Sequence, residues 1–268
     1  MNVLIRKSIP NFITLSNLFL GFTSIVLLSL SLYPENNNIN LACYLILIST
    51  ALDVLDGKIA RKLDISSDFG KEIDSLADLV SFCLCPSLLT FVYYYQILVL
   101  ESRLNISFLI FLSSFPLIFG AIRLAKYNAM KEMRESDKYL GLPTPANAIL
   151  LCSLILFAHK IVSFSSFFVE FILYDLLKNL ILFNEYVILS ISIVSSILLL
   201  SKINYEKFPL ISFRINRKNN LDLLKVIFFL ILLFLSVYLN FYELVLLFFI
   251  LIYIYGNLIK HLIYKIIK

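Results

Sequence analysis

Four aspartates form a spaced set in a segment that borders two apolar blocks. Residues 51–81 read ALDVLDGKIARKLDISSDFGKEIDSLADLVS and contain the set as Asp53, Asp56, Asp74 and Asp78. Ionisable residues at membrane depth are costly and are functional candidates by default. Four carboxylates gathered at low dielectric repel one another, so they must hold either protons or cations. Hard divalent cations favour carboxylate oxygens, and two ions about 4 Å apart form a clamp for phosphoryl chemistry.

Helical periodicity brings these acids onto shared faces together with small residues. At about 100° per residue, one arc of about 140° on the first helix holds Asp53, Asp56, Gly57, Ala60 and Arg61. On the next helix Asp74 and Asp78 share a face with Gly70, which precedes them by one turn. This arrangement predicts an acidic pocket between two adjacent helices.

The small residues and the arginine predict how a nucleotide would bind in that pocket. Gly57, Ala60 and Gly70 lack bulk, so a planar base and a diphosphate can approach the backbone, while Arg61 can pair with phosphate oxygens. The alternative is that Gly and Ala serve close packing between membrane helices. The joint spacing with the acids favours the nucleotide site.

The helices that must position these residues are membrane spans. The chain has 268 residues, of which 60% are hydrophobic and 15% charged, against roughly 25% charged in soluble domains. Apolar blocks of about 20 residues match the bilayer core and imply helices. We expect an all-α polytopic membrane bundle of about eight transmembrane helices, with a six-helix core, two C-terminal spans and a short N-terminal interfacial segment. The predicted spans are 14–33, 41–60, 76–99, 106–126, 145–163, 184–201, 222–239 and 243–260.

Charge placement predicts the orientation. With the N-terminus inside, 20 of the 23 Lys and Arg residues fall on the inner side, and only Arg103, Lys160 and Lys178 fall outside. The positive-inside rule then puts both termini and the aspartates on the cytoplasmic side. The stretch 166–183 is interrupted by charges, which favours an outer interfacial helix over a span. Because the basic residues lie in gaps between apolar blocks, no nucleic-acid partner is expected.

The aspartate spacing resembles the signature of the CDP-alcohol phosphotransferase family. It reads Asp53-x2-Asp56-Gly57-x2-Ala60-Arg61-x8-Gly70-x3-Asp74-x3-Asp78, and every fixed position of the signature is matched. The resemblance implies a helical membrane enzyme that transfers the phosphoalcohol part of a CDP-linked alcohol to an acceptor hydroxyl. It also implies that Asp53, Asp56 and Asp74 hold two divalent cations, Mg²⁺ or Mn²⁺, with Asp78 close to the ions and serving as base.

Four further stretches resemble bacterial membrane-bound phosphatidylserine synthases, a group within this family. They are residues 9–17 (IPNFITLSN), 123–128 (RLAKYN), 141–146 (GLPTPA) and 201–208 (SKINYEKF). The resemblance covers about residues 8–210, so the expected organisation is a family domain at 1–210 and a two-span extension of the same membrane domain at 211–268. It implies CDP-diacylglycerol and L-serine as substrates, a homodimer, and the cytoplasmic membrane of a bacterium as the location.

Three further residues are candidates for binding the acceptor substrate. A serine carboxylate needs a cation near the inner boundary, and Arg123 is the candidate, with Asn128 able to hydrogen-bond the amino acid. Asn17 is the third candidate, because a sister group that makes phosphatidylglycerophosphate usually has Arg there. Arg123 could instead extend to membrane lipid phosphates. Two other functions stay open: the same reaction with glycerol 3-phosphate or inositol phosphate, and an ion-coupled transporter, whose acids would more naturally lie near the bilayer midplane.

Overall fold

The chain folds as a helical bundle with one short two-stranded sheet. The computed structural model describes residues 3–33, 36–63, 68–96, 105–130, 138–164, 186–206, 227–228, 231–238 and 241–267. Its helices are α1 (Val3–Leu30), α2 (Ile39–Leu63), α3 (Asp68–Asp78), the π-helical η1 (Leu79–Leu84), α4 (Cys85–Tyr94), α5 (Ile106–Ser113), α6 (Phe115–Ala129), α8 (Thr144–Phe164), α10 (Val187–Leu199) and α12 (Tyr242–Ile267). The strands β1 (Lys138–Leu140) and β2 (Asn204–Glu206) pair antiparallel, an element that the all-α prediction lacked.

Within the described residues, five helices are long and apolar enough to cross a membrane: Pro10–Leu30, Ile39–Ile59, Asp68–Tyr94, Ile106–Ala129 and Tyr242–Ile266. They correspond to the predicted spans 14–33, 41–60, 76–99, 106–126 and 243–260. The predicted spans 145–163 and 184–201 are apolar helices too, but Thr144–Lys160 and Val187–Leu199 are shorter. The predicted span 222–239 falls partly, and the stretch 166–183 wholly, outside the described residues. The structure therefore supports a helical membrane bundle without reaching the predicted count of eight.

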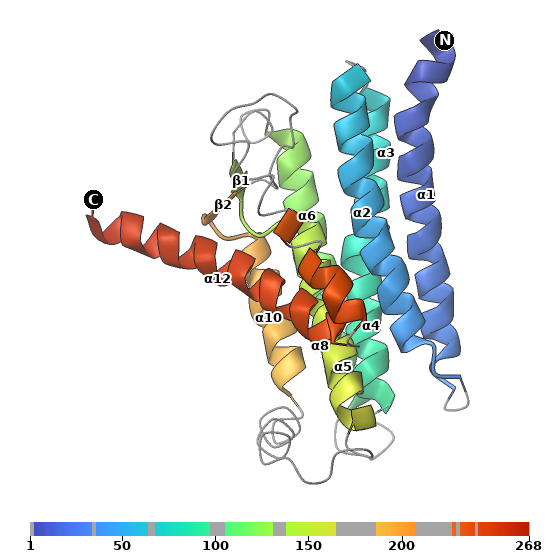
Figure 1. Cartoon of the computed structure of the whole chain (residues 1–268), viewed down its shortest axis with the longest axis vertical. Helices are drawn as coiled ribbons and strands as arrows, with labels where there is room; N and C mark the ends of the chain where they lie inside the picture. Colours follow the sequence, from blue (N-terminus) through green and yellow to red (C-terminus); the bar gives the residue numbers. More distant parts are fainter. Residues whose placement is uncertain are drawn as a thin grey trace.

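The N-terminal segment is not a separate interfacial element. Helix α1 continues unbroken from Val3 to Leu30, with Pro10 inside it. Figure 1 shows the N-terminus, the end of α2, the start of α3 and the β1–β2 pair toward the same end of the bundle, whereas α12 lies at a steep angle to α1 and α2. The helix ends that carry the aspartates and the small sheet thus lie on one side of the molecule.

Helix α1 packs through a face of small and polar residues. Thr14, Asn17, Gly21 and Ser24 follow one another at three- or four-residue spacing, which places them on one side of a helix, and all four are buried. Ser24 Oγ donates to the Ala42 carbonyl of α2 at 3.3 Å, while the Gly21 carbonyl accepts from Cys85 Sγ at 3.2 Å. Because small residues let membrane helices approach closely, α1 is held against α2 and against α4, which follows α3 through η1.

A second close approach joins α6 to the π-helical turn that follows Asp78. A Cβ placed on Gly120 would overlap Cys83 Sγ and would lie 3.0 Å from Cys83 Cβ. π-Helical turns are rare and occur frequently at functional sites. Here the tight contact between Gly120 and η1 brings the next turn of α6, which carries Arg123, alongside Asp78.

We expect Gly120→Ala to destabilise the protein by about 1–3 kcal/mol, because the added methyl group has no space beside Cys83. Thermal unfolding in detergent measures the effect as a lowered Tm. Gly256→Ala on α12 is the matched control, since no heavy atom lies within 4 Å of a Cβ built there. Adding Cys83→Ala should recover part of the loss. Equal Tm values for the Gly120 and Gly256 variants would contradict the tight packing.

Candidate active site

Three carboxylates converge where α2 and α3 meet. Asp53 and Asp56 come from α2 and Asp74 from α3, and one carboxylate oxygen of each lies within 4.8 Å of the other two. Asp56 is only 4% exposed, and Asp53 and Asp74 are half-buried. Asp74 Oδ1 is buried without a hydrogen-bond partner among the described residues. A divalent cation would remove the mutual repulsion and satisfy this oxygen, so the donor set fits a metal site.

Thr14 of α1 orients the most buried of these carboxylates. Its Oγ1 lies 2.8 Å from Asp56 Oδ2, to which it donates, and 3.1 Å from the Pro10 carbonyl. This threonine was not among the predicted site residues, although it stands in the 9–17 stretch that supported the resemblance. A hydroxyl on the opposite helix could not be assigned to one carboxylate from sequence, because the pairing depends on how α1 packs on α2.

If the cluster binds a divalent cation, Thr14→Val should weaken Mn²⁺ binding about tenfold, because partners that orient metal ligands typically contribute that much to metal affinity. The measurement is a Mn²⁺-binding titration of the purified protein. Thr23→Val is the control, since its Oγ1 donates only locally, to the Phe19 carbonyl at 2.8 Å on the exposed side of α1. An unchanged titration would restrict Thr14 to a packing role.

Asp78 lies beside the three carboxylates without being one of them. Its carboxyl group is within hydrogen-bonding reach of the Asp53 carboxyl and interacts electrostatically with Arg123. Asp78 Oδ1 is buried and has no hydrogen-bond partner among the described residues. Asp78 lies one turn of α3 beyond Asp74, and its carboxyl group interacts both with Asp53 of the acidic cluster and with the charge of Arg123.

Arg123 is a buried cation on α6. It is 7% exposed, and its guanidinium carbon lies 5.2 Å from the centre of the Tyr127 ring, a cation–π arrangement. Its Nε has no hydrogen-bond partner among the described residues. A buried guanidinium with an unused donor can bind a planar carboxylate. Because Arg123 is buried beside Asp78, its position does not support the alternative in which it extends to lipid phosphates.

The two asparagines predicted for the acceptor side occupy different places. Asn17 is fully buried, and its side-chain oxygen accepts from Ser49 Oγ of α2 while its carbonyl accepts from Ser81 Oγ of η1 at 3.2 Å. Asn17 therefore connects α1 to α2 and η1, one turn of α1 after Thr14. Asn128 exchanges hydrogen bonds with Ser75 of α3, its Nδ2 lying 2.9 Å from Ser75 Oγ.

Asn128 also lines a cavity of about 170 Å³ between α3 and α6. Apolar side chains dominate its other lining, among them Leu76, Leu79 and Leu124. The lining residues at positions 72, 75, 76 and 79 lie on a different face of this helix from Asp74 and Asp78, so the cavity is separate from the acidic cluster.

The residues predicted to contact the nucleotide are described only in part. Gly57 follows Asp56 directly in α2, and Gly70 precedes Asp74 by one turn in α3, so both glycines lie next to cluster residues along their helices. Ala60 and Arg61 belong to α2, but their side chains fall outside those that the structure describes. The placement of the Arg61 guanidinium stays a prediction.

The sequence of this chain is similar to those of known proteins. The family model for CDP-alcohol phosphatidyltransferase matches residues 7–197, which include every site residue discussed above. A Helicobacter pylori protein (strain 26695) is 33% identical over 228 residues, covering 85% of this chain and 79% of its own length. A Methanocaldococcus jannaschii protein is 32% identical over 212 residues, covering 76% of this chain and 78% of its own. In a third relative, from H. pylori strain J99, 38% identity extends over 152 residues, 56% of this chain and 58% of that protein. All three relatives are named CDP-diacylglycerol–serine O-phosphatidyltransferase.

Proposed function

This chain belongs to the CDP-alcohol phosphatidyltransferase family, and we propose that it transfers the phosphatidyl group of CDP-diacylglycerol to the hydroxyl of L-serine, giving phosphatidylserine and CMP. The observation that carries the proposal is the juxtaposition of an acidic cluster (Asp53, Asp56 and Asp74) with Asp78 and the buried Arg123. A phosphoryl transfer needs cations, a proton acceptor and a site for the acceptor substrate, and these groups would provide all three.

The acidic cluster, with Asp78 beside it, would hold two divalent cations, Mg²⁺ or Mn²⁺. The convergent oxygens and the unpartnered Asp74 Oδ1 and Asp78 Oδ1 support this assignment. Bound ions of this kind neutralise the diphosphate and the charge that develops during transfer. The small residues Gly57, Ala60 and Gly70 leave room for the cytidine diphosphate, with Arg61 pairing its phosphate oxygens.

Asp78 is the general base in this mechanism. It accepts the proton of the serine hydroxyl, whose oxygen attacks the β-phosphorus of CDP-diacylglycerol in line. A new oxygen–phosphorus bond forms, the bond from the β-phosphorus to the bridging oxygen of the diphosphate breaks, and CMP leaves with that oxygen. The interactions of Asp78 with both the cluster and Arg123 support this role, since a base must reach the hydroxyl that it deprotonates.

Arg123 binds the serine carboxylate, and Asn128 contributes at the same end of α6. We expect Arg123→Lys to raise the KM for serine about tenfold or more, because an ammonium group cannot reproduce the bidentate geometry of a guanidinium. The KM for CDP-diacylglycerol should change less than twofold. Steady-state kinetics with each substrate varied in turn measures both, and a parallel rise of the two constants would contradict a specific acceptor role.

The proposed setting is the cytoplasmic membrane of a bacterium. Both termini and the acidic cluster face the cytoplasm in this topology, CDP-diacylglycerol enters from the inner leaflet, and the protein forms a homodimer. The charge bias along the chain supports the orientation. Labelling single introduced cysteines from either side of sealed vesicles tests it.

One assay tests the proposed function. Purified protein is mixed with CDP-diacylglycerol and Mn²⁺, and CMP release is followed with serine, glycerol 3-phosphate or inositol phosphate as acceptor. CMP release that depends on serine is the expected result. Release that depends on another acceptor would keep the reaction class and change the substrate. No release with any of the three acceptors would overturn serine as the substrate and leave the family reaction with an acceptor outside this set.

A further inference from the structure

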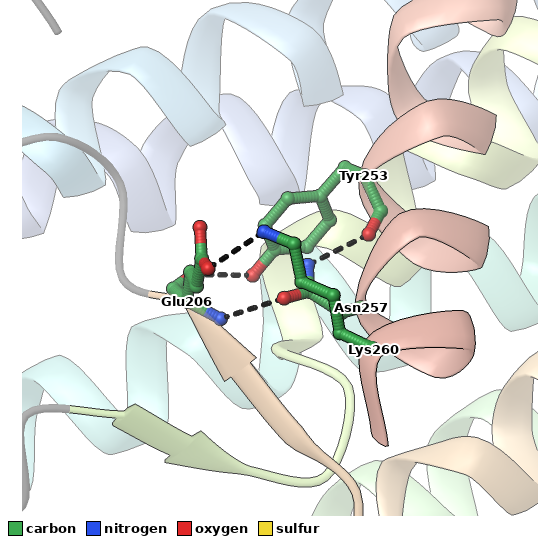
Figure 2. A network of polar contacts seen from close by, with 4 residues as sticks. All are labelled: Glu206, Tyr253, Asn257 and Lys260. Atoms are coloured by element: carbon green, nitrogen blue, oxygen red, sulfur yellow. Dashed lines mark hydrogen bonds and ion pairs between the residues drawn. The ribbon is translucent and has the colours of Figure 1, made fainter. Parts of the chain in front are cut away.

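Three side chains of the C-terminal helix α12 bind Glu206 of strand β2. Tyr253 Oη donates to the Glu206 carbonyl at 2.9 Å, Asn257 Oδ1 accepts from the Glu206 N–H at 3.2 Å, and Lys260 Nζ lies 2.8 Å from Glu206 Oε1 (Figure 2). The three residues follow one another at four- and three-residue spacing, so they share one face of α12. All of them lie beyond the family match, which ends at residue 197.

Asn257 is the central member of this contact. It is 6% exposed, and its Nδ2 donates to the Tyr253 carbonyl at 2.7 Å while its Oδ1 accepts from Glu206. A buried amide is costly unless its hydrogen bonds are satisfied. Apolar packing of α12 is already supplied by Ile250 and Ile254, which are buried against Leu142 and Leu199. Tyr205 of β2 belongs to the same buried cluster, and the polar contacts add directional hydrogen bonds that orient the strand on α12.

Strand pairing connects β2 to β1, which lies closer to the proposed acceptor residues. Glu206 pairs with Lys138, and Tyr205 pairs with Tyr139 in the antiparallel register. The Tyr205 ring is fully buried and lies 5.9 Å, centre to centre, from the Tyr253 ring. β2 is thus fixed to α12 on both sides of the strand, and β1 follows because its backbone is paired to β2.

Strand β1 in turn contacts the buried arginine. The Tyr139 ring lies 6.3 Å from the Tyr127 ring, and the Arg123 guanidinium lies over that same Tyr127 ring at 5.2 Å. A continuous set of contacts therefore runs from α12 through β2, β1 and Tyr127 to Arg123.

We propose that Tyr253, Asn257 and Lys260 are positioning residues for the acceptor substrate, holding the β1–β2 pair so that Tyr139 and Tyr127 keep Arg123 oriented beside Asp78. The inference rests on the proposed function, because it assigns Arg123 to the acceptor. It gives the C-terminal helix a specific part in the reaction. The metal and nucleotide side of the site lies on α2 and α3 and is not held by these contacts.

The test separates the acceptor from the other substrate. Tyr253→Phe removes one hydroxyl, and Asn257→Ala removes the central amide. We expect each variant to raise the KM for serine about threefold to tenfold, the effect of one lost hydrogen bond on a positioned group. The kcat and the KM for CDP-diacylglycerol should stay within twofold. Tyr255→Phe is the matched control, since it removes the same hydroxyl from the exposed side of α12 and should change nothing.

A double-variant cycle shows whether the effect acts through Arg123. In the Arg123→Lys protein, Asn257→Ala should raise the KM for serine by clearly less than it does in the wild type, because coupled residues are not additive. Full additivity, an unchanged KM for serine in both α12 variants, or a common loss of kcat and both KM values would each overturn the proposal. Failure of the proposed function looks different: the unaltered protein would then release no CMP in response to serine.

Discussion

Asp78→Asn is expected to lower kcat for serine-dependent CMP release by about 10² to 10⁴, the usual contribution of a general base. The amide has the size of the carboxyl group and can still donate a hydrogen bond to Asp53, so the neighbouring carboxylates should keep their places. It cannot accept the hydroxyl proton. Binding of Mn²⁺ and of CDP-diacylglycerol should therefore persist while turnover stops.

The measurement pairs single-turnover CMP release with calorimetric titration of CDP-diacylglycerol in detergent. Asp68→Asn is the matched control on the same helix, because Asp68 is exposed and paired with Lys71 at 2.9 Å; it should keep near-normal turnover. If the kcat of the Asp78 variant stayed within a factor of three of the wild-type value, a group other than Asp78 would have to accept the proton of the serine hydroxyl. If it lost nucleotide binding as well, the loss of turnover would be a binding defect and would not identify Asp78 as the base.

Asp74→Asn should have an effect of similar size for another reason. Asp74 is the one member of the acidic cluster that α3 supplies, so its charge joins the two helices around the proposed cations. Removing it leaves Asp53 and Asp56 on α2 alone. We expect kcat/KM at a fixed low Mn²⁺ concentration to fall about 10³-fold, in line with the several kcal/mol that such ions contribute.

A Mn²⁺ titration distinguishes this variant from the previous one. The activity of the Asp74 variant should rise again at high Mn²⁺ concentration, whereas that of the Asp78 variant should not. Chelation with EDTA should abolish the activity of the wild-type protein, and added Mn²⁺ or Mg²⁺ should restore it. A wild-type enzyme that is indifferent to EDTA, or an Asp74 variant with an unchanged titration, would remove the metal role from the cluster.

The sequence determined the local part of the site. The Asp53-x2-Asp56 and Asp74-x3-Asp78 spacings place each pair on one face of its helix, because a helix repeats every 3.6 residues whatever surrounds it. Mean hydropathy and block length likewise determined that the protein is a helical membrane bundle, since lipid requires backbone groups to be satisfied within each segment. Both inferences depend on residues that are near one another along the chain.

Only the tertiary structure decided which distant residues meet. Thr14 reaches Asp56, and Gly120 fits against Cys83 so that Arg123 stands beside Asp78, because of how three helices pack. The β1–β2 pair joins strands of three residues that are far apart in sequence, too short to stand out as a pattern. The hydrogen bonds and ion pair that Glu206 forms with Tyr253, Asn257 and Lys260 depend on the angle at which α12 crosses the bundle (Figure 1). Side-chain partners across helices follow from register and crossing angle, which many residues set together and no single motif specifies.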